Sequence, residues 1–101
     1  MPKKSLKKLT HRAHIFYSGR VHGVGFRYTA EKIALDLGLV GWVKNLQDGR
    51  VELLCEGAEA TIKKLLSQIQ ASSLGPHIKK VDCVWEKSTQ EFDDFRVEFS
   101  Y

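Results

Sequence analysis

Hydrophobic and polar residues recur along this chain in patterns that predict seven ordered segments. Two longer runs carry apolar residues three and four positions apart, which is typical of amphipathic helices, and they cover residues 26–37 and 58–71. Five shorter runs are typical of strands because apolar side chains fall on alternate positions or β-formers dominate. These predicted strands cover residues 14–18, 39–46, 50–56, 78–87 and 95–101.

The same patterns predict which side of each segment faces the core. In the helices the stripe comprises Phe26, Ala30, Ile33, Ala34 and Leu37, then Ile62, Leu65, Leu66 and Ile69. In the strands the expected core positions are Ala13, Ile15 and Tyr17, then Val51, Leu53 and Cys55, then Val81, Cys83 and Trp85, and finally Phe95, Val97, Phe99 and Tyr101.

The order of the segments is β-α-β-β-α-β followed by an additional C-terminal strand. Two amphipathic helices can cover only one face of a single sheet, so the order predicts an α+β, ferredoxin-like sandwich with a mainly antiparallel sheet. In that topology the first strand lies between the third and the fourth. Cys55 and Cys83 would then stand two strand spacings apart, about 10 Å, which is too far for a disulfide. We therefore predict free thiols.

Composition and charge narrow the class of protein. The chain has 101 residues, of which 43 % are hydrophobic, enough for one core and too many for a disordered protein. We predict a single domain over residues 13–101 and a basic, flexible tail over residues 1–12, which carries much of the net charge of +4. No apolar run approaches the roughly twenty residues that span a bilayer, and no signal core follows the tail. We expect a soluble, cytoplasmic monomer with no membrane partner.

A glycine-rich stretch between the first strand and the first helix is the strongest candidate for chemistry. Residues 19–27 read G-R-V-H-G-V-G-F-R, and three of them are glycines. Glycine lets successive backbone N–H groups turn into one concavity, and the following helix start adds unpaired N–H groups. Arg27 adds a planar fork of donors that fits two phosphate oxygens. The stretch is neither a dinucleotide fingerprint nor a Walker A loop, and it indicates a site for a small oxyanion.

Two side chains allow a functional and a structural interpretation. Arg27 falls in the first turn of the predicted helix, where the dipole disfavours a cation, so it is either an ordinary surface arginine or half of an anion site. Asn45 interrupts the end of a strand, where it either begins a turn or aims its carboxamide toward the loop after the neighbouring first strand. The histidines and cysteines lack metal-ligand spacing, so no metal site is expected.

Taken together, G-R-V-H-G-V-G-F-R, G-W-V-K-N at residues 41–45 and the following D-G-R-V-E resemble the acylphosphatases. The resemblance covers about residues 14–101. It implies hydrolysis of acyl phosphates to a carboxylate and inorganic phosphate, without metal or cofactor, with phosphate also acting as an inhibitor. It implies that Asn45 orients the attacking water and that Arg27 and the loop bind phosphate, the loop residues being Arg20, Val21, His22, Gly23, Val24, Gly25 and Phe26. His22 departs from the pattern, because the family usually has glutamine there.

Two other functions fit parts of the sequence. An RNA-binding module of the same architecture would use aromatic residues on the open sheet face, and Phe16 and the basic tail fit that role. The third strand has no aromatic-rich signature, because Leu53, Leu54 and Cys55 occupy it. A regulatory sensor of anions or carbamoyl phosphate would keep the same pocket. The single-domain length favours an independent enzyme with a small acyl phosphate substrate and no nucleic-acid partner.

Overall fold

The computed structural model describes residues 10–99. Its elements follow the predicted order, with one additional 3₁₀ turn (η2) before the fourth strand. They are β1 His11–Gly19, α1 Phe26–Asp36, β2 Val40–Asn45, β3 Val51–Gly57, α2 Glu59–Ala71, η2 Gly75–His77, β4 Ile78–Lys87 and β5 Phe95–Glu98. Within the described residues, neither helix is long and apolar enough to cross a membrane.

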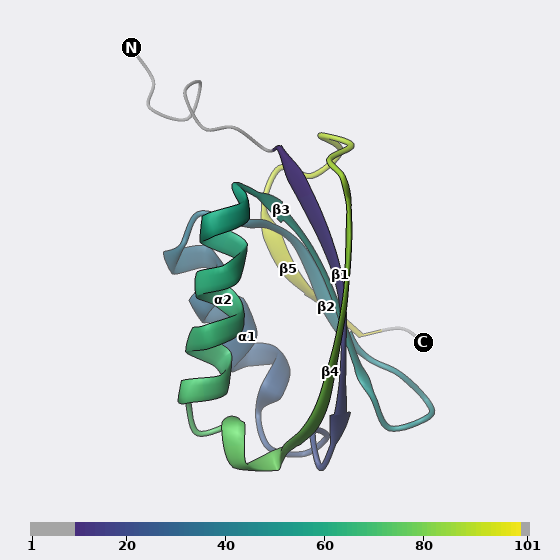
Figure 1. Ribbon diagram of the computed structural model, residues 1–101. Helices are drawn as coiled ribbons and strands as arrows, with labels where there is room; N and C mark the ends of the chain where they lie inside the picture. The colour runs from purple at the N-terminus through teal and green to yellow at the C-terminus, as the bar shows by residue number, and fades with distance from the viewer. Residues whose placement is uncertain (1–9, 100–101) are drawn as a thin grey trace.

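The five strands form one sheet in the order β4-β1-β3-β2-β5, and both helices lie on the same face of it (Figure 1). Neighbouring strands are antiparallel except for β5, which runs parallel to β2. This arrangement confirms the predicted ferredoxin-like α+β fold, with β1 between β3 and β4. It corrects one expectation, because β3 separates β1 from β2 and these two strands are not neighbours.

The core lies between the sheet and the helices and contains the predicted faces of β1 and β3. Ala13, Ile15 and Leu53 are fully buried there. The N-terminal residue Phe26 of α1 packs on Tyr17 of β1, with their ring centroids 4.8 Å apart. This contact fixes the start of α1 against the sheet and therefore fixes the loop that precedes it.

The edge strand β4 is less buried than its pattern suggested. Val81, Cys83 and Trp85 face the helix side as predicted, since each pairs with a core residue of β1. Cys83 packs against the core, but Val81 and Trp85 remain exposed. The helices make their main contacts with β2, β3 and β5, so the β4 edge is covered less than the rest of the sheet. Both cysteines are free, as predicted.

The ends of two strands differ from the prediction. β1 begins at His11, so residues 11 and 12, which we assigned to the basic tail, belong to the sheet. β5 ends at Glu98, and Phe99 is exposed rather than buried with Phe95. The remainder of the predicted tail, residues 1–9, and the predicted core position Tyr101 lie outside the described residues.

A buried carboxylate organises the connection from β4 to β5. Glu56 has no exposed surface, and its oxygens accept hydrogen bonds from the Arg12 guanidinium, the Ser88 hydroxyl, the Thr89 hydroxyl and the N–H groups of Thr89 and Gln90, at 2.8–3.0 Å. Burial alone would raise the pKa of Glu56, but these hydrogen bonds outweigh it and the pKa is lowered. The carboxylate therefore anchors the segment that leads into β5.

Candidate active site

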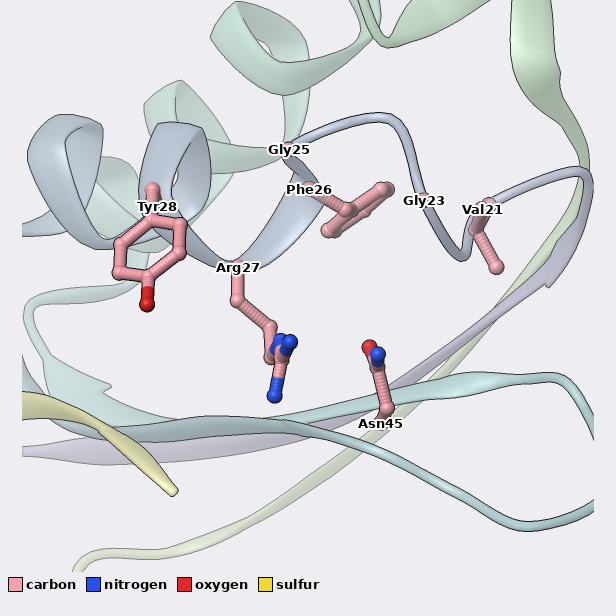
Figure 2. Close-up of a pocket in the computed structure, with 7 residues that line it drawn as sticks. All are labelled: Val21, Gly23, Gly25, Phe26, Arg27, Tyr28 and Asn45. Carbon is pink, nitrogen blue, oxygen red and sulfur yellow. The ribbon is translucent and has the colours of Figure 1, made fainter. Parts of the chain in front are cut away.

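A small pocket of about 140 Å³ lies between the start of α1 and the end of β2 (Figure 2). Its lining combines the glycine-rich loop, the first turn of α1 and one residue of β2: Val21, Gly23, Gly25, Phe26, Arg27, Tyr28 and Asn45. The structure thus brings Arg27 and Asn45 together, although β3 separates the strand that carries Asn45, β2, from β1, which leads into the loop. Figure 2 shows both side chains directed into the space between the helix and the sheet.

The backbone of the loop leaves a run of its N–H groups without a carbonyl acceptor among the described residues. Gly23 and Gly25 both have φ of 75°, a conformation that side chains disfavour, and a Cβ at either would meet nothing within 4 Å. In the described part of the chain, the N–H groups of Arg20 and Thr29 have carbonyl acceptors, whereas those from Val21 to Tyr28 have none. This run of free donors ends in a helix N-terminus with no side-chain cap, which is a favourable place for an anion.

Arg27 adds a full positive charge to this cluster of donors. It is partly buried, and within residues 10–99 no carboxylate lies close enough to pair with it. Its guanidinium carbon instead lies 4.9 Å from the centre of the Phe99 ring. The guanidinium N–H groups therefore remain available to an anion in the pocket.

Asn45 is placed by the alternation of β2. Gly41 and Val43 are buried on the helix side of the sheet, so Asn45, two positions further on, faces the same side. Its Oδ1 atom is buried and has no hydrogen-bond partner among the described residues. A buried polar atom without a partner is costly, and in a pocket this arrangement is typical of an atom that meets a ligand or a water molecule.

Three of the predicted phosphate-binding residues do not line the pocket. The Arg20 N–H is used by the His77 carbonyl at 2.9 Å, and Val24 packs against the core. His22 lies 2.9 Å from the Arg50 carbonyl through Nε2, which must carry the hydrogen because a carbonyl oxygen only accepts. His22 thus connects the loop to the turn between β2 and β3, and its role in this structure is to hold the loop in position.

Sequence reasoning missed one aromatic residue that lines the pocket and a second that contacts Arg27. Tyr28 lines it, although it lies outside the apolar stripe of α1 and was assigned no role. Phe99 contacts Arg27 from beyond the end of β5, although alternation placed it in the core. The sequence feature that could have indicated them was a tyrosine directly after Arg27, outside the apolar stripe of the helix.

Among residues 10–99, no group of histidine, cysteine or carboxylate side chains is arranged to hold a metal ion.

The sequence model of the acylphosphatase family matches residues 13–97. The chain belongs to the acylphosphatase family. It is 43 % identical over 86 residues to an acylphosphatase from Roseiflexus sp., covering 85 % of this chain and 92 % of that protein. It is 45 % identical over 80 residues to an acylphosphatase from Acaryochloris marina, covering 79 % and 85 %.

Solved structures of the family agree with this assignment. The fold is similar to the crystal structure of the acylphosphatase from Bacillus subtilis, with a TM-score of 0.81 and 33 % identity over 87 % of this chain and 98 % of that one. An acylphosphatase from Coxiella burnetii gives a TM-score of 0.76 with 35 % identity over 91 % and 97 %. The resemblance stated from the sequence is thereby confirmed, and the chain is an acylphosphatase enzyme.

Proposed function

We propose that the pocket between α1 and β2 hydrolyses acyl phosphates, and that Arg27 and Asn45 are its catalytic residues. One observation supports this assignment above the others. Within residues 10–99, the N–H groups of the loop residues that line the pocket and the Arg27 guanidinium have no hydrogen-bond acceptor, and they share this pocket with Asn45 Oδ1, an acceptor that has no donor. The donors suit a phosphoryl group, and the acceptor suits a water molecule beside it.

The loop and Arg27 would carry most of the catalytic effect. As water attacks phosphorus, negative charge spreads over the phosphoryl oxygens, and donors already in position stabilise it without rearranging. Among the described residues, the N–H groups of Val21 to Tyr28 have no carbonyl acceptor, and the pocket is lined by Val21, Gly23, Gly25 and Phe26 of this run together with Arg27. Arg20 is excluded from this set because its N–H already has an acceptor.

Asn45 would hold the attacking water. Its Oδ1 can accept one hydrogen of the water, which turns an oxygen lone pair toward phosphorus. The water oxygen then bonds to phosphorus, the phosphorus–oxygen bond to the acyl group breaks, and the carboxylate leaves with the electron pair. The leaving carboxylate needs no proton because the pKa of its acid is about 4. The proton of the water passes to an oxygen of the substrate's own phosphate.

The open face of the sheet does not favour the alternative of RNA binding. The ring of Phe16, which such a module would use for stacking, is covered by the Arg50 guanidinium at 4.7 Å and by the ring of His14 at 4.7 Å. Glu52 lies on the same face and forms an ion pair with Lys44 at 3.9 Å. A carboxylate at that position repels a phosphate backbone.

The monomeric state and the cytoplasmic location stay predictions.

Hydrolysis of benzoyl phosphate, with and without inorganic phosphate, tests the proposal. The wild-type protein should release benzoate, and added phosphate should inhibit it competitively. Arg27→Ala should lower kcat/KM by about a hundredfold or more and weaken inhibition by phosphate, because a charged donor is removed from the site. Arg96→Ala is the control, since Arg96 is exposed and forms an ion pair with Asp94 at 3.4 Å, away from the residues that line the pocket. Full activity of Arg27→Ala would contradict the proposal.

A further inference from the structure

An exposed aromatic residue covers the guanidinium of Arg27. Phe99 follows directly after β5, and because β5 runs parallel to β2, it reaches the end of the sheet where Asn45 also lies. Phe99 is 63 % exposed, which is unusual for a phenylalanine. The Arg27 guanidinium carbon lies 4.9 Å from the ring centre, within the range of a cation–π contact.

A second ring packs against Phe99. Tyr28, the residue after Arg27, has its ring centroid 6.5 Å from that of Phe99, at an angle of 51°. Tyr28 is also largely exposed, and the two rings and the guanidinium form a cluster beside the pocket, which Arg27 and Tyr28 line. Two exposed aromatic side chains in contact, one of which covers a cation, indicate a contact that serves the cation rather than the core.

An aromatic ring suits an arginine that must bind a phosphate. A carboxylate partner would hold the guanidinium but would also occupy its N–H fork and neutralise its charge. A ring contacts only the face of the guanidinium, so the N–H groups at its edge stay free. Within the described residues, the ring of Phe99 is the partner of Arg27, and no carboxylate takes that place.

We propose that Phe99 is a positioning residue, which holds the Arg27 guanidinium in its phosphate-binding orientation through the electrostatic attraction of its ring. The inference rests on the proposed role of Arg27. Without the ring, the long side chain of Arg27 regains rotamer freedom that phosphate binding must then remove. Phe99 would therefore raise the affinity for substrate and phosphate together, with little effect on kcat.

The first experiment compares Phe99→Leu with Phe92→Leu. Phe92 makes the same kind of contact with Arg12, at 5.5 Å, and Arg12, unlike Arg27, does not line the pocket, so Phe92 is a matched control. For Phe99→Leu, both KM for benzoyl phosphate and the inhibition constant of inorganic phosphate should rise by about two- to fivefold, the effect of an exposed cation–π contact. Phe99→Tyr and Phe99→Trp should retain wild-type values, and Phe92→Leu should leave both constants unchanged.

A second experiment separates the electrostatics of the ring from its shape. Pentafluorophenylalanine at position 99 keeps the size of the ring but removes the negative charge of its face, so it should behave as Phe99→Leu does. Equal constants for pentafluorophenylalanine and phenylalanine would overturn the proposal. A rise in KM without any change in inhibition by phosphate would also overturn it, because the ring would then contact the acyl group.

The two proposals fail in distinguishable ways. If the wild-type protein hydrolyses no acyl phosphate, the proposed function fails, and phosphate binding followed by isothermal calorimetry still tests whether Phe99 acts on Arg27. If the wild type is active and Phe99→Leu equals it in both constants, the proposed function stands and the role of Phe99 is refuted. Near-ultraviolet circular dichroism of each variant shows whether it is folded.

Discussion

Replacing Asn45 with alanine distinguishes a catalytic role of this side chain from a structural one, because the two roles predict opposite changes in stability. The Oδ1 atom of Asn45 is buried without a partner among the described residues. A buried polar group in that state destabilises the folded protein by about 1–3 kcal/mol. Asn45→Ala removes this atom. If Asn45 serves catalysis rather than structure, the substitution should therefore raise the free energy of unfolding.

The size of the effect follows from where the side chain lies. Asn45 borders an existing pocket, so truncating it enlarges that pocket and creates no new cavity in the core. Because a water molecule in the pocket recovers part of the cost of the unpartnered oxygen, we expect a gain at the lower end of the range, about 1 kcal/mol. This corresponds to a rise in Tm of about 4–8 °C for a domain of this size. Turnover should fall by about a hundredfold, the usual result of losing a positioned reactant.

Three measurements on one preparation decide the question. Urea unfolding without phosphate gives the free energy of unfolding, benzoyl phosphate hydrolysis gives kcat, and the inhibition constant of phosphate reports the intact loop and Arg27. Asn45→Ala should raise the free energy of unfolding, lower kcat and leave the inhibition constant of phosphate unchanged. Gln47→Ala, which removes an exposed carboxamide two residues away, should change none of them. A loss of stability above about 1 kcal/mol, or a wild-type kcat, would refute the reasoning.

Two further predictions concern the residues that hold the site in place. His22→Ala should lower the free energy of unfolding by about 1 kcal/mol and weaken inhibition by phosphate, because the bond to the Arg50 carbonyl is lost, whereas His22→Gln can re-form that bond and should retain both values. Glu56→Gln should destabilise the protein at pH 7 by about 3 kcal/mol, as expected when a buried charge pair loses one partner. Folding lowers the pKa of Glu56, so its contribution is full above the ordinary carboxylate pKa of about 4.3 and is lost as pH falls through the lower folded-state value. The gap between wild type and Glu56→Gln in urea unfolding should therefore narrow toward pH 3, and a constant gap would contradict this account.

The fold was predictable because local patterns carry it. Alternation in β1 and β3 and the helical stripes indicate two layers, and the order of elements leaves few topologies for them. Glu56 shows where this reasoning stops. Its position in β3 alternates away from the core, and its burial arises from the loop at residues 88–90 and from Arg12 across the sheet. Contacts between segments so distant in sequence leave no periodic signal.

The candidate site was predictable in part for the same reason. The glycine-rich loop and Arg27 form a contiguous segment whose chemistry can be read locally, and the structure places Asn45 beside them as expected. The contribution of Phe99 depends on β5 pairing parallel to β2, which the alternation of β5 does not specify. The alternation predicted a buried side chain, whereas β5 ends one residue earlier and leaves the ring free to reach Arg27.

The parallel pairing of β5 with β2 also determines when the site can form during refolding. The two strands are distant in sequence, and contacts of this kind are made late and slowly compared with helices and hairpins. Recovery of enzymatic turnover after dilution from denaturant should therefore lag behind recovery of the helical circular dichroism signal. Phosphate, which needs the assembled pocket, should slow unfolding and leave the early refolding rate unchanged.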